Sequence, residues 1–129
     1  MAITIASVTL DCAEALTVAR FWSAALERPL DPKASSDFAA IGFAGRRDTA
    51  GCGLVAHDGE STWMFVRVPE PKTAKNRIHL DVMTTDPEHE IDRLVGLGAT
   101  RARDMEEYGY MWTVMADPEG NEFCVATTR

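Results

Sequence analysis

The fold is decided by a short pattern that occurs twice, as VTLDC at Val8–Cys12 and as IHLDV at Ile78–Val82. The two copies are 70 residues apart, and both are mostly apolar or β-branched, which is typical of a buried strand. Each copy is followed by residues with helical spacing of apolar side chains. The repetition therefore predicts two similar modules within one chain.

The first half of the chain predicts a strand, a helix and three further strands. The first strand is Ile3–Cys12 and the helix is Glu14–Leu26. Pro29 and Pro32 end the helical region, because proline cannot continue the hydrogen-bond ladder. The three further strands, separated by turn-forming residues, are Asp37–Phe43, Cys52–His57 and Trp63–Val68.

The second half repeats this order. A strand at Arg77–Met83 precedes a helix that Asp86 caps and Gly98 closes, with a buried face made by Ile91, Leu94 and Val95. Between the last two strands, the residues at 117–120 (DPEG) have the preferences of a type I turn. The last strands are Thr100–Met105, Met111–Ala116 and Glu122–Ala126.

These elements predict an α+β fold with the order βαβββ twice. We expect a single domain over residues 1–129, with modules at about 1–70 and 76–129. Two such modules bury their open faces by pairing, either within one chain or between two chains.

Composition excludes several classes of protein. The chain has 129 residues and a net charge of −7, which argues against a nucleic-acid partner. The longest uncharged run, Met1–Leu10, is half the ~20 residues of a membrane-spanning helix and lacks the features of a secretory signal. Cys12, Cys52 and Cys124 are odd in number and widely spaced, which favours reduced thiols. We therefore expect a cytoplasmic protein that does not bind membranes.

Three strings resemble the glyoxalase-like proteins of the vicinal oxygen chelate superfamily. They are DCAE at 11–14 with ARFW at 19–22, VPEPK at 68–72 with NRIHLD at 76–81, and DPEGNEF at 117–123. The resemblance implies paired βαβββ modules whose cupped mixed sheets surround a pocket, with the helices outside, usually in a homodimer. Members of the superfamily include glyoxalase I, extradiol dioxygenases, epimerases and antibiotic-sequestering proteins.

The resemblance also implies four metal-ligand positions, and only two of them carry a donor here. The position in the first strand falls on Ser7 or, in the alternative register, on Thr9, and the strand Trp63–Val68 contains no carboxylate, amide or imidazole. His79 matches the family's histidine, whereas Cys124 stands where the family has a glutamate. Zinc normally takes three or four protein ligands, so we expect a degenerate metal site with no built-in metal.

A different donor set remains open as an alternative. Glu122 shares a strand face with Cys124, so His79, Glu122 and Cys124 are a candidate three-ligand site for zinc, nickel, manganese or iron. With or without metal, His79 is also a candidate acid or base, since imidazole titrates near neutral pH. The opposing interpretation makes His79 a core histidine and Cys124 a small packing residue.

The sequence thus predicts a protein that binds a small, partly apolar molecule in a sheet-lined pocket. His79 and Glu122 are the expected catalytic or orienting residues, and the expected ligand-binding residues are Ser7, Phe65, Trp112 and Cys124. The alternative is a metal-dependent lyase, isomerase or dioxygenase-type enzyme that uses His79 with Glu122 or Cys124. A purely structural domain, with a pocket filled by its own side chains, is a third possibility.

Overall fold

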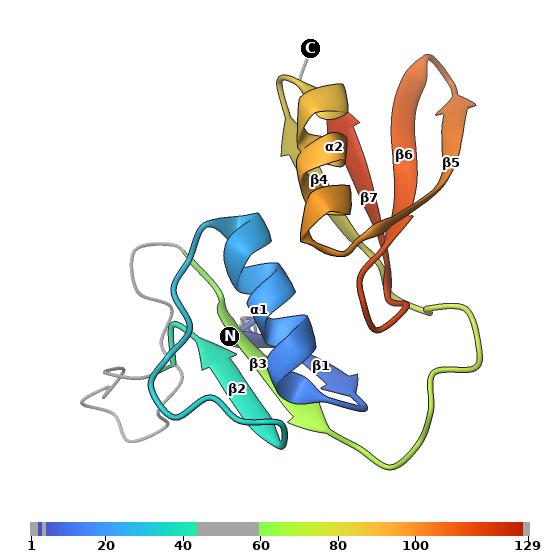
Figure 1. Ribbon diagram of the computed structural model, residues 1–129. Helices are drawn as coiled ribbons and strands as arrows, with labels where there is room; N and C mark the ends of the chain where they lie inside the picture. The colour runs from blue at the N-terminus through green and yellow to red at the C-terminus, as the bar shows by residue number, and fades with distance from the viewer. Residues whose placement is uncertain (1–2, 4, 44–59, 128–129) are drawn as a thin grey trace. The chain divides into compact units, whose positions relative to one another are not determined.

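The computed structural model describes residue 3, residues 5–43 and residues 60–127. The chain forms two compact units, Met1–Pro71 and Lys72–Arg129, here called the N-terminal and C-terminal units (Figure 1). The predicted strand at Cys52–His57 lies outside the described residues.

The N-terminal unit contains β1 (Ser7–Cys12), α1 (Ala15–Leu26), β2 (Phe38–Ile41) and β3 (Thr62–Arg67). Its described sheet has the order β1-β3-β2, in which β1 is parallel and β2 antiparallel to β3. The first strand starts at Ser7 rather than at Ile3. Ser7 pairs with Thr62, the first residue of β3, and among the described residues before it Ile3 is 98% exposed.

Helix α1 packs its apolar stripe against this sheet (Figure 1). Glu14 caps its first turn, because the Glu14 carboxylate accepts hydrogen bonds from the backbone N–H groups of Leu16 and Thr17. Five of its residues are buried, and the Trp22 ring lies 5.0 Å from that of Trp63 on β3. The predicted helix is therefore confirmed.

The C-terminal unit has the complete βαβββ order. Its elements are β4 (Leu80–Thr84), α2 (Pro87–Leu97), β5 (Thr100–Glu107), β6 (Tyr110–Ala116) and β7 (Glu122–Thr127). They form a mixed sheet with the order β4-β7-β6-β5, in which β4 is parallel to β7. The first strand of this unit begins at Leu80 rather than Arg77, so His79 lies immediately before it.

Helix α2 has the predicted caps. The Asp86 carboxylate accepts a hydrogen bond from the His89 N–H at 3.3 Å, and Gly98 ends the helix with a φ of 119°. Ile91 and Leu94 are buried as predicted, but Val95 is 46% exposed, so its place in the buried face was wrong. The apolar stripe of α2 is narrower than its spacing indicates.

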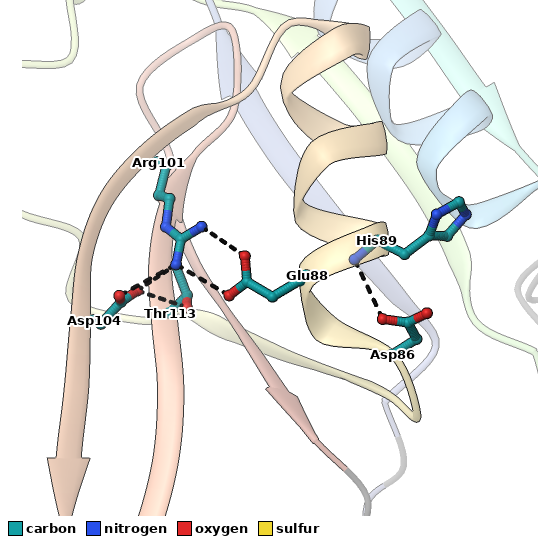
Figure 2. Close-up of polar contacts among 6 residues, drawn as sticks. All are labelled: Asp86, Glu88, His89, Arg101, Asp104 and Thr113. Carbon is teal, nitrogen blue, oxygen red and sulfur yellow. Dashed lines mark hydrogen bonds and ion pairs between the residues drawn. The ribbon is translucent and has the colours of Figure 1, made fainter.

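Polar contacts hold α2 against one face of the C-terminal sheet (Figure 2). The Arg101 guanidinium on β5 donates to the Glu88 carboxylate on α2 and to the Asp104 carboxylate on its own strand. The Thr113 hydroxyl on β6 donates to the same Asp104 carboxylate at 2.9 Å. Arg101, Asp104 and Thr113 therefore lie on the helix side of this sheet.

Strand register puts a different set of residues on the opposite face. Asp81, Cys124, Val114 and Arg103 are successive partners across β4, β7, β6 and β5. The rows on either side of this one contain Arg101 and Thr113, and adjacent rows point to opposite faces. Asp81 and Cys124 therefore lie on the face away from α2, together with every second residue along their strands.

Two helices on mixed sheets confirm the predicted α+β class. Neither helix in the described part of the chain has the length and apolar character needed to cross a membrane.

Candidate functional site

A cavity of about 530 Å³ opens on the C-terminal unit. Trp112 and Ala126 belong to the sheet face away from α2, by the register described above, and they contribute to its wall. The side chains that surround it are mostly apolar, with polar groups at His79 and Asp81. The full lining is His79, Asp81, Met83, Tyr110, Met111, Trp112, Ala126 and Thr127.

At the polar end of this cavity, the lining residues His79 and Asp81 lie close to the buried Cys124, which is not itself among the lining residues. The His79 Nδ1 atom lies 3.3 Å from an Asp81 carboxylate oxygen and 3.9 Å from the Cys124 Sγ atom. One ligand atom from each of the three residues lies within 4.8 Å of the others. We call His79, Asp81 and Cys124 the polar triad. Cys124 is buried, whereas about half of the His79 side chain is exposed.

The surroundings of Cys124 disfavour the thiolate form of its side chain. Burial raises the pKa of Cys124, and the nearby Asp81 carboxylate raises it further by its charge and its hydrogen bond. Lys75 and Arg103 oppose this effect more weakly. A cysteine nucleophile needs a stabilised thiolate, so this environment does not activate Cys124 for attack.

Glu122 has a different partner. Its carboxylate forms an ion pair with the Lys75 ammonium group, which lowers the pKa of Glu122. Strand parity groups Glu122 with His79 and Cys124 but carries no information about this lysine. Among the described residues, those that line the cavity do not include Glu122.

The other predicted site residues are divided between the units. Trp112 lines the cavity in the C-terminal unit. Ser7 and Phe65 belong to the N-terminal unit, where Phe65 is fully buried and its ring lies 6.4 Å from that of Trp63. Their roles in ligand binding stay predictions.

Asp81 was not predicted as a site residue, although its position in the sequence carries a signal. His79 and Asp81 are two residues apart within the predicted strand Arg77–Met83, and this spacing predicts both side chains on one face, as it does for Glu122 and Cys124. The parallel pairing of β4 with β7 then sets Asp81 directly beside Cys124. That pairing requires knowledge of the sheet order, which the sequence pattern did not provide.

A family model described as a glyoxalase-like domain matches residues 7–126. No curated protein sequence matches the chain significantly. The matched range spans most of each unit and includes all of the predicted site residues.

Solved structures of low sequence identity share the fold. A fosfomycin resistance protein, FosX, from Listeria monocytogenes, complexed with Mn(II) and a dihydroxypropylphosphonic acid, has a TM-score of 0.70 at 10% identity over 98% of this chain and 90% of its own. The bleomycin-binding protein of Streptomyces verticillus, complexed with copper(II)-bleomycin, has a TM-score of 0.60 at 17% identity over 100% and 99%.

A third structure agrees with these two. It is a glyoxalase/bleomycin resistance protein/dioxygenase family enzyme from Burkholderia phytofirmans, with a TM-score of 0.65 at 18% identity over 98% of this chain and 100% of its own. The family match and the shared fold confirm the resemblance that the three sequence strings indicated, and the chain belongs to the glyoxalase-like family of the vicinal oxygen chelate superfamily.

Proposed function

We propose that the protein binds a small, partly apolar molecule in the cavity of its C-terminal unit. The observation that carries this proposal is the composition of that cavity. Its volume, about 530 Å³, lies in the range of small-molecule sites, and such sites combine an apolar wall with a few polar groups. Met83 and Trp112 are part of an apolar wall, and His79 and Asp81 supply the polar groups.

The separation of the apolar wall from the polar groups of the cavity indicates the kind of ligand that fits. An aromatic or other flat apolar part would lie against Trp112, whose indole ring offers a large contact area. A polar group would point to His79 and Asp81, where it can form hydrogen bonds. The sequence-based prediction gave Glu122 this orienting role beside His79, but the Lys75–Glu122 ion pair supports giving it to Asp81 instead.

This binding does not need the family's four-ligand metal chemistry. Only His79 and Cys124 of the four implied positions carry a donor, so the inherited metal site is degenerate. The bleomycin-binding protein from Streptomyces verticillus is a structural neighbour whose name describes binding alone. We therefore place binding ahead of the alternative, a metal-dependent lyase, isomerase or dioxygenase-type enzyme that uses His79 with Glu122 or Cys124.

The proposal includes a homodimer that acts in the cytoplasm. The family resemblance supports the dimer, and the scattered cysteines support a reducing compartment. Light scattering on the purified chain tests the first point, because a mass of one chain would contradict it.

The binding experiment is a melting-temperature screen of aromatic compounds and antibiotics, with a chelator present, followed by equilibrium dialysis of the compounds that stabilise the protein. We expect Trp112→Ala to weaken binding about tenfold or more, since it removes a large contact surface. Tyr108→Ala is the matched control, because Tyr108 is 96% exposed on the same hairpin and is not among the lining residues described. A screen without any stabilising compound, or equal losses in both variants, would contradict the proposal.

A further inference from the structure

We propose that the cavity of the C-terminal unit selects organic cations, that is, small apolar molecules that carry a quaternary ammonium group or a protonated amine. The inference rests on the proposed function, because it names the charge of the ligand that the same cavity binds. It is carried by the side chains around the cavity, where aromatic faces and a carboxylate occur together.

Two aromatic rings belong to the wall of this cavity. Tyr110 and Trp112 are two residues apart on β6, so both side chains lie on the sheet face away from α2. The face of an aromatic ring attracts a cation placed over it, most strongly in tryptophan. Met83 and Met111 also line the cavity, and their thioether groups adapt to the shape of a ligand. The wall therefore offers an electron-rich surface to a charged nitrogen and to the carbon atoms bonded to it.

The polar end of the cavity adds a carboxylate that a ligand can reach. The Asp81 carboxylate lies 3.3 Å from the His79 Nδ1 atom and also forms a hydrogen bond with Cys124. An ionised carboxylate has about four acceptor positions, so these two neighbours leave some of them for a ligand. The Asp81 side chain is 63% exposed. Its negative charge already acts within this site, since it raises the pKa of the adjacent Cys124.

Further carboxylates flank the other end of the cavity. On the hairpin of β5 and β6, Glu106 is the direct partner of Met111, and Glu107 is the direct partner of Tyr110. Both glutamates are exposed, and both of their partners line the cavity. The described lining residues include Asp81 and no lysine or arginine. Negative charge is therefore present at both ends of the apolar wall.

The basic side chains on this face of the sheet are placed elsewhere. Lys75 forms an ion pair with Glu122, and Lys72 acts on the same carboxylate. Arg103 is on β5 and Asp81 on β4, which are the opposite edges of the sheet. Three strand spacings amount to roughly 14 Å, beyond the screening length of about 8 Å at physiological salt. An anionic ligand in the cavity would therefore face Asp81 without an adjacent lysine or arginine among the lining residues described.

The test compares three probes of similar size and shape that differ in charge. Benzyltrimethylammonium is the cation, neopentylbenzene is its neutral isostere with carbon in place of nitrogen, and phenylmethanesulfonate is the anion. Equilibrium dialysis in sealed cells, with the full chain and a chelator, measures their affinities. We expect the ammonium probe to bind about fivefold more tightly than neopentylbenzene, or better, and the sulfonate to bind most weakly. Added sodium chloride should weaken the binding of the ammonium probe but not that of neopentylbenzene.

Two variants with the same change in net charge locate the effect. Asp81→Asn removes the charge and keeps the size of the side chain, so the preference for the ammonium probe should be lost while neopentylbenzene binding changes by less than about twofold. Asp11→Asn is the matched control, because Asp11 is an exposed aspartate on β1, the first strand of the other unit. We expect this variant to keep the wild-type preference.

The outcomes separate this inference from the proposed function. If neopentylbenzene or the sulfonate binds the wild type as tightly as the ammonium probe, or if folded Asp81→Asn keeps the preference, the inference is overturned while binding in the cavity stands. If none of the three probes binds, the inference is also overturned, and the melting-temperature screen decides about the proposed function by itself. The order of the three probes is measured on the wild type, so the test does not depend on the folding of Asp81→Asn, which circular dichroism establishes.

Discussion

The two units share the same pairing of strands and the same place for the helix, but different residues hold the helix against the sheet. Each begins with a strand and a helix, and each pairs its first strand in parallel with its last. Helix α1 buries five residues, among them Phe21 and Trp22, whereas α2 buries only Ile91 and Leu94. In the N-terminal unit, the helix is held mainly by apolar packing. In the C-terminal unit, the helix is held partly by the ion pair between Arg101 on β5 and Glu88 on α2.

The first strands show the same contrast in polar chemistry. Asp11 on β1 is paired with Val66, and Asp81 on β4 is paired with Cys124. In the N-terminal unit, the aspartate of the first strand therefore lies beside an apolar residue. Strand β3 contains no histidine, cysteine, aspartate or glutamate. The strand pairing of the N-terminal unit therefore forms without a counterpart of the Asp81–Cys124 pair. Among the residues that the structure describes, such a cluster of His, Asp and Cys occurs in the C-terminal unit only, and a role in binding explains this better than a role in folding.

The largest expected effect comes from deleting the central aromatic residue of each core. Phe65 and Phe123 are both almost completely buried, so Phe65→Ala and Phe123→Ala should each lower the free energy of unfolding by about 3–5 kcal/mol. Urea denaturation followed by circular dichroism measures this loss. Phe65→Ala should also change the tryptophan emission of the folded protein, because Trp63 is its neighbour.

Where the alanine variants do not fold, Phe65→Leu and Phe123→Leu remove less side-chain volume at the same positions. A loss below about 1 kcal/mol at either position would mean that the residue does not hold its core together, and the two units would then differ in more than their polar residues.

The sequence predicted the elements of this molecule better than its site. Helical spacing and capping residues such as Asp86 and Gly98 are local signals, so the helices could be placed from them. The first strands were predicted too long because the start of a strand depends on where its partner strand begins. Ser7, the first residue of β1, lies opposite Thr62, the first residue of β3. Asp81 was missed for the same reason, since its neighbour Cys124 is 43 residues away and is brought close only by the sheet order.

The next effect in size concerns the ends of the helices. α2 ends at Gly98 with a φ of 119°, and a Cβ atom there would lie 3.3 Å from Pro118. α1 ends at Glu27, a residue with a side chain, with a φ of 53°. Gly98→Ala should therefore cost roughly 1–2 kcal/mol of unfolding free energy. Glu27→Gly should change it by less than about 1 kcal/mol, because relief of strain is offset by a more flexible unfolded chain.

Thermal unfolding of the two variants measures this difference. An equal loss in both would show that the C-terminal end of α2 does not depend on the left-handed conformation of Gly98, and that the helix ends do not distinguish the units.

The smallest effect tests the polar attachment of α2. The Thr113 hydroxyl and, after it, the Arg101 guanidinium lower the pKa of Asp104 below its ordinary value. A carboxyl group whose pKa is lowered by folding contributes stability above its unfolded pKa, and this contribution is lost as the pH falls through the folded pKa. Wild type should therefore be more stable than Asp104→Asn at neutral pH, and the difference should shrink below about pH 4.

Thr113→Val sharpens this measurement, because it removes one donor to Asp104 and keeps a side chain of similar shape at a buried position. The pKa of Asp104 should then rise toward its ordinary value, so the pH-dependent loss of stability should be smaller than in wild type and should be complete at a higher pH. Urea denaturation at a series of pH values follows both variants. If the stability difference between wild type and Asp104→Asn were the same at pH 7 and pH 3, the charge of Asp104 would contribute nothing to stability. Helix α2 would then be held by the Arg101–Glu88 ion pair and by the apolar contacts of Ile91 and Leu94.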